Sequence, residues 1–585
     1  MHTTKQNLTG YPSTDKPWQK YYSEEAINAK LPECSVYEYL WESNKDYLDN
    51  VAISYMGTKI KFRELFENIE KTAKAFYALG LRKRDVVVIA SVATPETVYA
   101  FYALDRLGVI SNMVDPRTSI EGIHEYICEV DAKHVFVIDA AYEKICKAIE
   151  GTKVKHVIIT SPVDSLTGAK KHIYNMVGVL KGTRPKLSKD SIKWSEFILA
   201  GGNAIPELAE YKKNRCCVIV HTGGTTGNSK GVMLSDDNIN ALVCQSIWTG
   251  IDMKREHTWL DIMPPFIAYG IGMGLHLPLS IGMETILIPK FDAKKFDELL
   301  LKHKPIHMVG VPSYWGTIIN SKKMQKEDLS YIIAPTVGGD TMDPVLEKKA
   351  NEFLKSHGCS YGITKGYGMT EVSAGVTGTL DAINEIGSVG VPFVKSIVSI
   401  FDPITGEELT YGKEGEVCIC SPNIMLGYYG NEEATNNIIK IHKDGTRWIH
   451  SGDIGYMKDN GSLFLVDRIK RMIIRYDGFK VFPSFIENVV SEHKDIETCC
   501  AVGTQDTAHS QGKLPVVYAV LKHDCENERQ ALESELAELC KNELPEYAQP
   551  VAFKFIEKMP LTPIGKVDYR ALEDMENELL QREAN

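Results

Sequence analysis

A short loop rich in glycine, threonine and lysine is the part of the sequence best suited to chemistry. It reads His221-Thr-Gly-Gly-Thr-Thr-Gly-Asn-Ser-Lys-Gly-Val232 and follows an apolar run, Cys216 to Val220. Glycines allow positive φ and let backbone N–H groups close around an anion, while hydroxyls and a lysine add donors and charge. The loop therefore predicts a polyphosphate site. The predicted phosphate-binding residues are Thr222, Gly223, Gly224, Thr225, Thr226 and Lys230.

The loop differs from the P-loop of the NTPases, in which Gly directly precedes the Lys and Ser or Thr follows it. Here Ser229 precedes Lys230 and Gly231 follows it. By itself the pattern is also compatible with a glycine-rich surface turn without a ligand. It resembles the phosphate loop of the AMP-forming adenylating enzymes, the superfamily of acyl-CoA synthetases, luciferases and peptide-synthetase adenylation domains. The usual sequence in that superfamily is T-S-G-T-T-G-x-P-K-G. This chain has Gly223 in place of Ser and Ser229 in place of Pro, and both substitutions keep the loop small.

Four further segments match the same superfamily in its own order, so the resemblance covers nearly the whole chain. They are Gly366-Tyr-Gly-Met-Thr-Glu371, His450-Ser-Gly-Asp453, Asp467-Arg-Ile-Lys470 and the run from Pro560 through Lys566 to Leu572. Any one of them alone is more simply explained as a turn, a cap or a solvated charge. Together, and in order, they favour an enzyme that activates a carboxylic acid with ATP.

The resemblance implies three catalytic residues. Glu371 would bind Mg²⁺, a hard cation that prefers oxygen ligands. Thr370 would offer its hydroxyl to the α-phosphate, and Lys566 would reach the site from a mobile C-terminal domain. Because a carboxylate must meet a phosphate, positive charge is required between the two anions.

Other motif residues would bind the nucleotide. The resemblance implies that Tyr367 stacks on adenine, that Asp453 accepts both ribose hydroxyls, and that Arg468 adds a second ribose or phosphate contact. The glycines would allow the backbone to approach the nucleotide closely. The remaining predicted nucleotide residues are Gly338, Gly339, Asp340, Gly366, Gly368 and Lys470.

The superfamily's hinge segment sets the expected domain organisation: an AMP-binding domain at 1–467 and a mobile domain at 468–585. The C-terminal domain would pivot at Lys470 between two half-reactions. The first makes acyl-adenylate with Lys566 in the site, and the second presents Tyr476-Asp-Gly-Phe-Lys-Val-Phe-Pro483 to admit a thiol.

The segment 263–276 bears on the acid. It contains no acidic residue that could bind an α-ammonium group, so an amino-acid substrate is not expected. A gating His of aryl- and fatty-acid members is replaced by Ile267. An apolar acyl or aryl group suits the residues expected there. They are Ile267, Tyr269, Ser373 and Gly375.

Coenzyme A is the expected acceptor, because no carrier-protein domain follows residue 585. The alternative acceptor is a separate carrier protein. A second alternative is that the chain is a non-catalytic nucleotide-binding relative of these enzymes. ATP, Mg²⁺ and coenzyme A are the expected cofactors. The oligomeric state and the length of the acyl chain are left open.

The bulk composition indicates an ordinary soluble globular protein, and the length of 585 residues predicts more than one domain. The net charge of −11 argues against a nucleic-acid partner. Thirteen cysteines without C-x₂-C spacing predict free thiols in a reducing compartment, and hence a cytoplasmic protein. Neither a signal peptide nor a transmembrane run of about 18 apolar residues is visible.

The elements that must position these residues alternate between helix and strand, which predicts βαβ units and mainly parallel sheets. Helices are expected at 62–81, 96–107 and 529–544, and strands at 85–91, 134–139, 156–160, 285–288, 308–311 and 331–337. Short alternating strands between 384 and 466 predict a β-rich subdomain, followed by a compact α+β tail. Residues 1–35 read as irregular. A Lys- and Gly-rich insertion at 163–190 favours an ordinary amphipathic surface helix over a membrane-surface helix.

Overall fold

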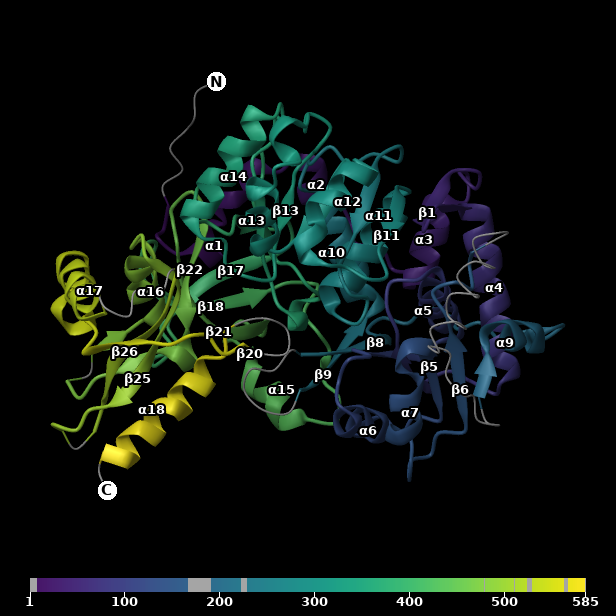
Figure 1. Cartoon of the computed structure of the whole chain (residues 1–585). Coiled ribbons are helices and arrows are strands. Elements are labelled where there is room, and N and C mark those ends of the chain that lie inside the picture. Colours follow the sequence, from purple (N-terminus) through teal and green to yellow (C-terminus); the bar gives the residue numbers. More distant parts are fainter. Residues whose placement is uncertain are drawn as a thin grey trace.

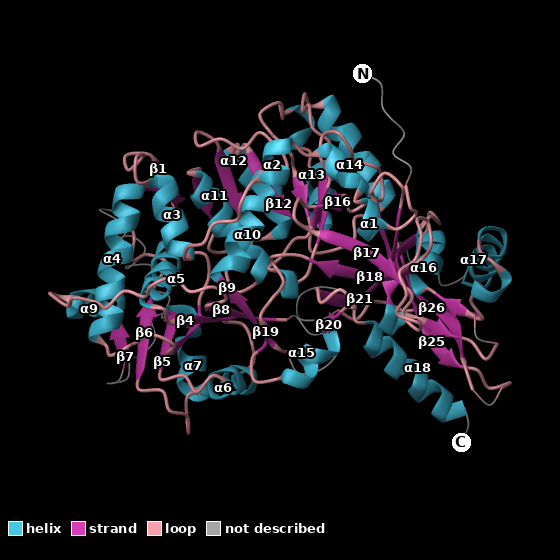
Figure 2. Ribbon diagram, turned by 180° about the vertical axis from the view of Figure 1, so that it is seen from behind, coloured by secondary structure: helices cyan, strands magenta, loops and turns pink. Residues whose placement is uncertain are grey.

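The computed structural model describes residues 8–166, 191–222, 229–477, 479–509, 511–522, 529–561 and 567–583. Two long mixed sheets make up most of the N-terminal part (Figures 1 and 2). A smaller antiparallel sheet follows, and the C-terminal strands and helices lie beyond it, at the yellow end of the colour scale in Figure 1. The predicted 163–190 insertion falls mostly at 167–190, outside the described residues.

The eight-stranded sheet has the order β19-β9-β8-β4-β3-β5-β6-β7. Its strands are β3 Val86–Ala90, β4 Ile110–Val114, β5 His134–Ile138, β6 His156–Thr160, β7 Ser191–Lys193, β8 Cys216–His221, β9 Gly231–Ser235 and β19 Gly427–Tyr428. From β8 to β7 all pairs are parallel, and β9 and β19 add an antiparallel edge.

Strand β3 explains why this sheet is covered on both faces. Its successive side chains point to opposite sides. Val87 and Ile89 enter the core that holds the aromatic residues of α4 (Phe62–Ala78) and α5 (Pro95–Leu107). Val88 and Ala90 enter a second core with α6 (Ile120–Glu129) and α7 (Tyr142–Ala148). An unbroken apolar strand is therefore the sequence signature of a two-sided sheet.

The nine-stranded sheet has the order β16-β15-β14-β13-β12-β10-β11-β1-β2 and is parallel from β14 to β1. Its strands are β1 Val51–Tyr55, β2 Thr58–Lys61, β10 Thr258–Asp261, β11 Glu284–Leu287, β12 His307–Gly310, β13 Thr336–Val337, β14 Thr364–Tyr367, β15 Thr377–Gly378 and β16 Val391–Pro392. The helices in this part of the chain are α3 Val36–Asn44, α10 Asp236–Ile247, α11 Leu277–Ile281, α12 Phe296–His303, α13 Pro312–Asn320 and α14 Pro344–Ser356.

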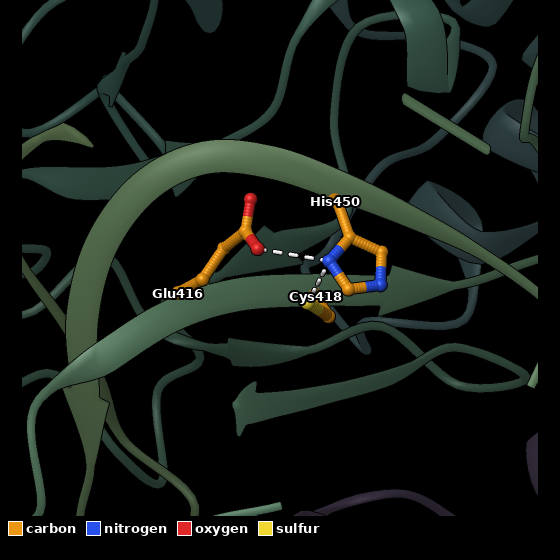
Figure 3. Close-up of side chains that lie close together, drawn as sticks. All are labelled: Glu416, Cys418 and His450. Carbon is orange, nitrogen blue, oxygen red and sulfur yellow. Dashed lines mark hydrogen bonds and ion pairs between the residues drawn. The ribbon is translucent and has the colours of Figure 1, made fainter. Parts of the chain in front are cut away.

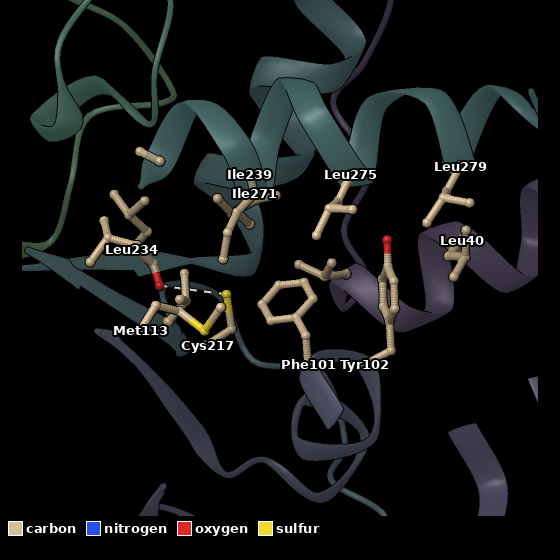
Figure 4. Packing of buried hydrophobic residues seen from close by; sticks show 14 of the residues in the cluster. Leu40, Phe101, Tyr102, Met113, Cys217, Leu234, Ile239, Ile271, Leu275 and Leu279 are labelled. Atoms are coloured by element: carbon tan, nitrogen blue, oxygen red, sulfur yellow. Dashed lines mark hydrogen bonds between the residues drawn. The ribbon is translucent and has the colours of Figure 1, made fainter. Parts of the chain in front are cut away.

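Apolar packing joins the two large sheets. Ile239 of α10, Ile271 and Leu275 of the π-helical turn Gly270–His276, and Leu279 of α11 share one buried cluster with Phe101 of α5 (Figure 4). The helices between the sheets therefore belong to one continuous core, which fixes the sheets relative to each other.

The third sheet and the C-terminal part complete the chain. Strands β17 Ile397–Phe401, β18 Gly415–Cys420, β20 Ile439–Ile441, β21 Arg447–Met457 and β22 Leu463–Arg468 form the antiparallel sheet, with α15 Glu432–Ile438 beside it. Beyond it follow β23 Ile473–Ile474, β24 Lys480–Val481, α16 Pro483–Ser491, β25 Ile496–Gln505, β26 Lys513–Leu521, α17 Arg529–Glu543, β27 Ala552–Phe555 and α18 Tyr569–Glu583. Two hydrophobic cores consist only of residues from Ile473 onward.

The predicted α/β class, with mainly parallel sheets, a β-rich subdomain and a small α+β C-terminal part, is confirmed. Two local predictions were wrong. The strand expected at 331–337 is reduced to Thr336–Val337, because Ala334 adopts φ 46° and ends the extended run. From residue 8 onward, the N-terminal stretch holds three short helices, at Pro12–Asp15, Pro17–Tyr21 and Glu24–Asn28, and Pro occupies the first turn of two of them.

Candidate active site

Adjacent parallel strands carry two of the predicted motifs to one edge of the nine-stranded sheet. β13 and β14 pair in parallel, with Val337 opposite Lys365. Gly338 therefore follows the carboxyl end of one strand, and Tyr367 ends the next. Ligands of open α/β sheets bind outside the carboxyl ends of the strands. The topology thus places the segments 338–340 and 366–371 where a nucleotide site is expected.

The acidic residue of the second motif lies beside a tyrosine from another sheet. The Tyr428 hydroxyl donates to Glu371 Oε1 at 2.6 Å, and the backbone N–H of Met425 donates to the Glu371 carbonyl at 2.9 Å. Tyr428 lies on β19, opposite Val232 of β9. Since β9 starts directly after the phosphate loop, this pairing brings Lys230 Nζ to 4.8 Å from the Tyr428 ring centre.

Glu371 interacts electrostatically with two positively charged side chains, Lys230 and Arg468. Burial raises the pKa of the Glu371 carboxyl above its usual value. The hydrogen bond from Tyr428 and the charges of Arg468 and Lys230 oppose this rise in pKa. A buried carboxylate oxygen that gains from nearby positive charge fits a hard cation such as Mg²⁺.

A second tyrosine–carboxylate pair forms at the β21–β22 strand pair. The Tyr367 hydroxyl donates to Asp453 Oδ2 at 2.6 Å, and Arg468 Nε lies 2.6 Å from Asp453 Oδ1. Asp453 and Arg468 are direct partners in the antiparallel register. Burial and the neighbouring Asp453 raise the pKa of the Tyr367 hydroxyl, so it remains a donor at neutral pH.

A bulge in β21 directs Asp453 towards Tyr367. Cys418 of β18 pairs with His450, but Glu416, two residues away, pairs with Ile454. Two residues of β18 therefore span four of β21, and Gly452 inside this segment adopts φ 71°. Glu416 closes the bulge because its Oε1 accepts from Gly452 N at 3.0 Å. Bulges of this kind re-aim side chains next to functional sites.

The glycines of the 366–371 motif have a packing role in addition to the predicted nucleotide role. A Cβ at Gly368 would lie 1.7 Å from the Ala374 carbonyl oxygen, and one at Gly366 would lie 2.9 Å from that of Thr377. Gly339 adopts φ 79°, and Asp340 is exposed, with its Oδ1 accepting from Thr341 N at 3.0 Å.

The ends of the phosphate loop are tied together, although the loop itself is not described. Thr222 N donates to the Lys230 carbonyl at 3.1 Å, and Lys230 N donates to Thr222 Oγ1 at 3.2 Å. The predicted residues Gly223, Gly224, Thr225, Thr226 and Lys566 lie outside the described residues. Thr370 is half-buried at the start of the 3₁₀ turn Thr370–Val372.

The residues predicted for the acid lie close to the 366–371 motif. Tyr269 is half-buried, but its hydroxyl oxygen is buried and would lie 3.3 Å from a Cβ at Gly338. Ile267 packs on the main core. Ser373 is buried at φ 58°, and its hydroxyl donates to the Asn423 carbonyl at 2.9 Å. The Asn423 amide in turn donates to the Gly375 carbonyl at 2.7 Å.

The hinge segment contacts the C-terminal part directly. Asp467 Oδ2 accepts from Ser484 N at 2.9 Å, at the start of α16, and Asp467 Oδ1 lies 3.7 Å from Arg471 Nη1. Lys470 is exposed in the short 3₁₀ turn Ile469–Arg471. Arg468, which binds Asp453, is thus only two residues from the predicted pivot.

Sequence reasoning missed three residues that the structure places in this site. Tyr428 holds Glu371, Asn423 clamps the turn from Ser373 to Gly375, and Glu416 closes the bulge before Asp453. The run Leu426-Gly-Tyr-Tyr-Gly430 carried a signal for the first, since glycine-flanked aromatics suggest a positioned ring. Asn423 and Glu416 carried no such signal, because their partners are distant in sequence.

Two family models and several curated relatives match most of the chain. The AMP-binding enzyme family model matches residues 40–429, and the model of the AMP-binding enzyme C-terminal domain matches residues 486–566. A long-chain-fatty-acid–CoA ligase of Bacillus subtilis (strain 168) is 27% identical over 97% of this chain and 99% of its own length. A probable 4-coumarate–CoA ligase 1 of Dictyostelium discoideum is 30% identical over 95% and 98%.

Solved structures share the fold at lower identity. An anthranilate CoA ligase in complex with anthranoyl-AMP superposes with a TM-score of 0.78 at 17% identity, covering 94% of this chain and 99% of its own. At that identity the likeness supports the architecture alone. Among the described residues, no helix has both the length and the apolar character needed to cross a bilayer.

Proposed function

The chain belongs to the AMP-binding enzyme family and is an AMP-forming ligase of the acyl-CoA synthetase type, and on that premise we propose a reaction for its site. In this proposal ATP activates a fatty or aryl carboxylic acid to acyl-AMP with release of pyrophosphate. Coenzyme A then takes the acyl group and AMP leaves. The ligases of fatty acids and of 4-coumarate among the relatives support both kinds of acid.

The observation that carries the proposal is the pair of buried carboxylates, each held by a tyrosine. Glu371, bonded to Tyr428, suits the metal and phosphate end of ATP, and Asp453, bonded to Tyr367, suits the ribose end. A carboxylate has two oxygens that can accept from two hydroxyls. Glu371, Lys230 and Thr370 are proposed to bind Mg²⁺ and phosphate, where the metal would supply charge neutralisation.

Asp453, Arg468 and the 338–340 turn are proposed to hold the nucleoside, with Tyr367 against adenine. Lys566 is proposed to enter the site for adenylation, because two anions must approach each other. Lys470 is proposed as the pivot that afterwards brings in the 476–483 face, and the domains as 1–467 and 468–585. The contacts of Asp467 with the start of α16 support a hinge there.

The proposed acyl pocket is lined by Ile267, Tyr269, Ser373 and Gly375. Because the Ser373 hydroxyl already donates to the Asn423 carbonyl, its part is to shape the turn rather than to bind the acid. The atoms nearest to the position of a Cβ at Gly375 belong to Phe393 and Leu242, at 3.4 and 3.8 Å. An apolar wall of this kind suits an alkyl chain or an aromatic ring.

Coenzyme A is proposed as the acceptor over a carrier protein, since the relatives are CoA ligases along their whole length. The cytoplasm is proposed as the compartment, because the twelve cysteines in the described part of the chain are all free.

A pyrophosphate-release screen over fatty, aryl and short-chain acids with ATP and Mg²⁺ tests the first half-reaction. AMP release with added CoA, compared with a phosphopantetheinylated carrier protein, tests the second. Pyrophosphate release with none of the acids would contradict the proposal. If only the carrier protein stimulates AMP release, then the carrier protein rather than CoA is the acceptor.

A further inference from the structure

Three kinds of metal-binding side chain meet beside the bulge in β21. Glu416 and Cys418 lie two residues apart on β18, and His450 of β21 is the register partner of Cys418. His450 Nδ1 lies 2.8 Å from Glu416 Oε2 and 3.4 Å from Cys418 Sγ (Figure 3). One oxygen, one sulfur and one nitrogen therefore all lie within 4.8 Å of one another.

We propose that Glu416, Cys418 and His450 form a binding site for a thiophilic divalent cation of the zinc type, separate from the Mg²⁺ of catalysis. Zinc accepts carboxylate, thiolate and imidazole ligands, often three from the protein and one from water. A sulfur ligand disfavours Mg²⁺ and Ca²⁺, which require oxygen. The mixed donor set thus selects the class of metal.

The donor separations are close to those that a tetrahedral ion requires. Ligands about 2.0–2.3 Å from zinc are about 3.3–3.7 Å apart at tetrahedral angles. The nitrogen–sulfur separation of 3.4 Å already falls in that range, and the nitrogen–oxygen separation of 2.8 Å must widen slightly. The Glu416 side chain alone can supply that movement, while the strands that carry Cys418 and His450 keep their register.

A neighbouring histidine is placed to orient the ligand ring. His442 Nε2 lies 3.1 Å from His450 Nε2, on the side of the ring opposite Nδ1. When Nδ1 binds a metal, the Nε2–H of His450 can donate to His442. Metal-binding histidines almost always donate their other N–H to such a partner, which fixes the tautomer. His442 is itself held by stacking on Trp448, at 5.0 Å and 12°.

Burial favours a defined site over a surface cluster. Cys418 is fully buried and Glu416 is 8% exposed, while the His450 side chain is 19% exposed and leaves one side open to solvent. Phe401 and Trp448 pack with Cys418 and exclude water from the thiol side. On metal binding the thiol proton passes to solvent, because the thiolate is the ligand.

A plain hydrogen-bond network accounts for only part of the cluster. Glu416 bridges His450 Nδ1 and Gly452 N, and that alone explains a carboxylate at 416 and a donor at 450. A thiol adds only a weak donor or acceptor to such a network. The sulfur ligand at Cys418 distinguishes a metal site from a hydrogen-bond network that only closes the bulge. Cys418 is therefore the residue to test.

Cobalt(II) is the probe, because thiolate–cobalt charge transfer and four-coordinate ligand-field bands report the ligands directly, apart from activity. The full chain is freed of metal with a chelator and titrated with Co²⁺ in excess Mg²⁺, which occupies oxygen-only sites. The variants are built in a Cys128→Ser background. This removes the exposed Cys128, whose sulfur lies 3.5 Å from His124 Nε2 and could bind cobalt at the surface.

One equivalent of Co²⁺ with a charge-transfer band is expected, and Zn²⁺ should displace it. Cys418→Ser should lose the band and weaken binding at least tenfold, whereas Cys420→Ser, two residues along the same strand, should keep both. Zn²⁺ should raise the melting temperature of the parent but not of Cys418→Ser. The proposal is overturned if no saturable Co²⁺ binding occurs, or if the band survives in Cys418→Ser with folding intact by circular dichroism. Loss of the band in Cys420→Ser would equally overturn it.

Discussion

The two buried carboxylates of the site differ in how their charge is balanced. Glu371 and Asp453 each accept a hydrogen bond from a tyrosine hydroxyl at 2.6 Å. Asp453 also forms an ion pair with Arg468 at 2.6 Å, whereas Glu371 forms no ion pair within the part of the chain that the structure describes. The charge of Asp453 is therefore neutralised by an adjacent arginine, whereas the charge of Glu371 is balanced by the more distant Arg468 and Lys230.

The difference suggests two different tasks. A carboxylate paired across a strand register is held in one orientation, which suits recognition of a fixed group such as a ribose. A buried carboxylate without an adjacent cation gains most from a metal ion, because burial penalises its charge. Substitutions at the two positions should therefore affect different steps, and four predictions test this.

Glu371→Gln should have the largest effect. The amide keeps the size of the side chain but cannot neutralise Mg²⁺, so the adenylation rate should fall by about 10²–10³-fold. Pyrophosphate release at saturating ATP, measured over a Mg²⁺ titration, checks this. Glu407→Gln, at an exposed position, serves as the control. A fall of less than threefold, with the Mg²⁺ dependence unchanged, would mean that Glu371 is not the metal ligand.

Asp453→Ala should chiefly weaken ATP binding. Loss of two hydrogen bonds to a charged acceptor costs about 1–3 kcal/mol, or about 5–150-fold in Kd. Calorimetry with ATP measures it, and Asp453→Asn separates the charge from the shape. An unchanged Kd for ATP would remove Asp453 from the nucleotide site. Circular dichroism must show an intact fold, since Arg468 and Tyr367 lose a partner.

Substitutions of the two tyrosines should give smaller effects, again on the Mg²⁺ requirement at one position and on ATP binding at the other. Tyr428→Phe and Tyr367→Phe each delete one hydrogen bond, worth about 1 kcal/mol or about fivefold. Tyr428→Phe should raise the Mg²⁺ concentration needed for half-maximal adenylation, and Tyr367→Phe should raise the Kd for ATP. Equal shifts of both quantities in both variants would show that the two pairs act as one unit.

The smallest effect concerns pH and stability without Mg²⁺. The pKa of Glu371 is raised in the folded chain, so the folded state binds this proton more tightly than the unfolded state. The stability that this proton provides is full below the unfolded pKa, whose usual value is 4.5, and is lost as pH rises through the folded pKa. Thermal melts from pH 4 to 8 should show Glu371→Gln losing less stability than the parent over that rise. A parallel loss in both proteins would contradict the raised pKa.

Elements that depend on local pattern could be predicted from the sequence. The strand expected at 156–160 is β6 His156–Thr160, and the helix expected at 529–544 is α17 Arg529–Glu543. Both have a clear periodicity or β-branched run. The strand expected at 331–337 failed because the same apolar run contains Ala334 at positive φ, a conformation set by its surroundings rather than by its type.

The sequence by itself determined the family, the order of the motifs and the α/β architecture, because these rest on short-range patterns of residue type and spacing. Only the tertiary structure decided which side chains meet. Tyr428 reaches Glu371 across 57 residues and Tyr367 reaches Asp453 across 86, through a strand pair and a two-residue bulge. Such contacts depend on sheet order and register, which a linear pattern does not encode, because register is fixed by the packing of both strands together.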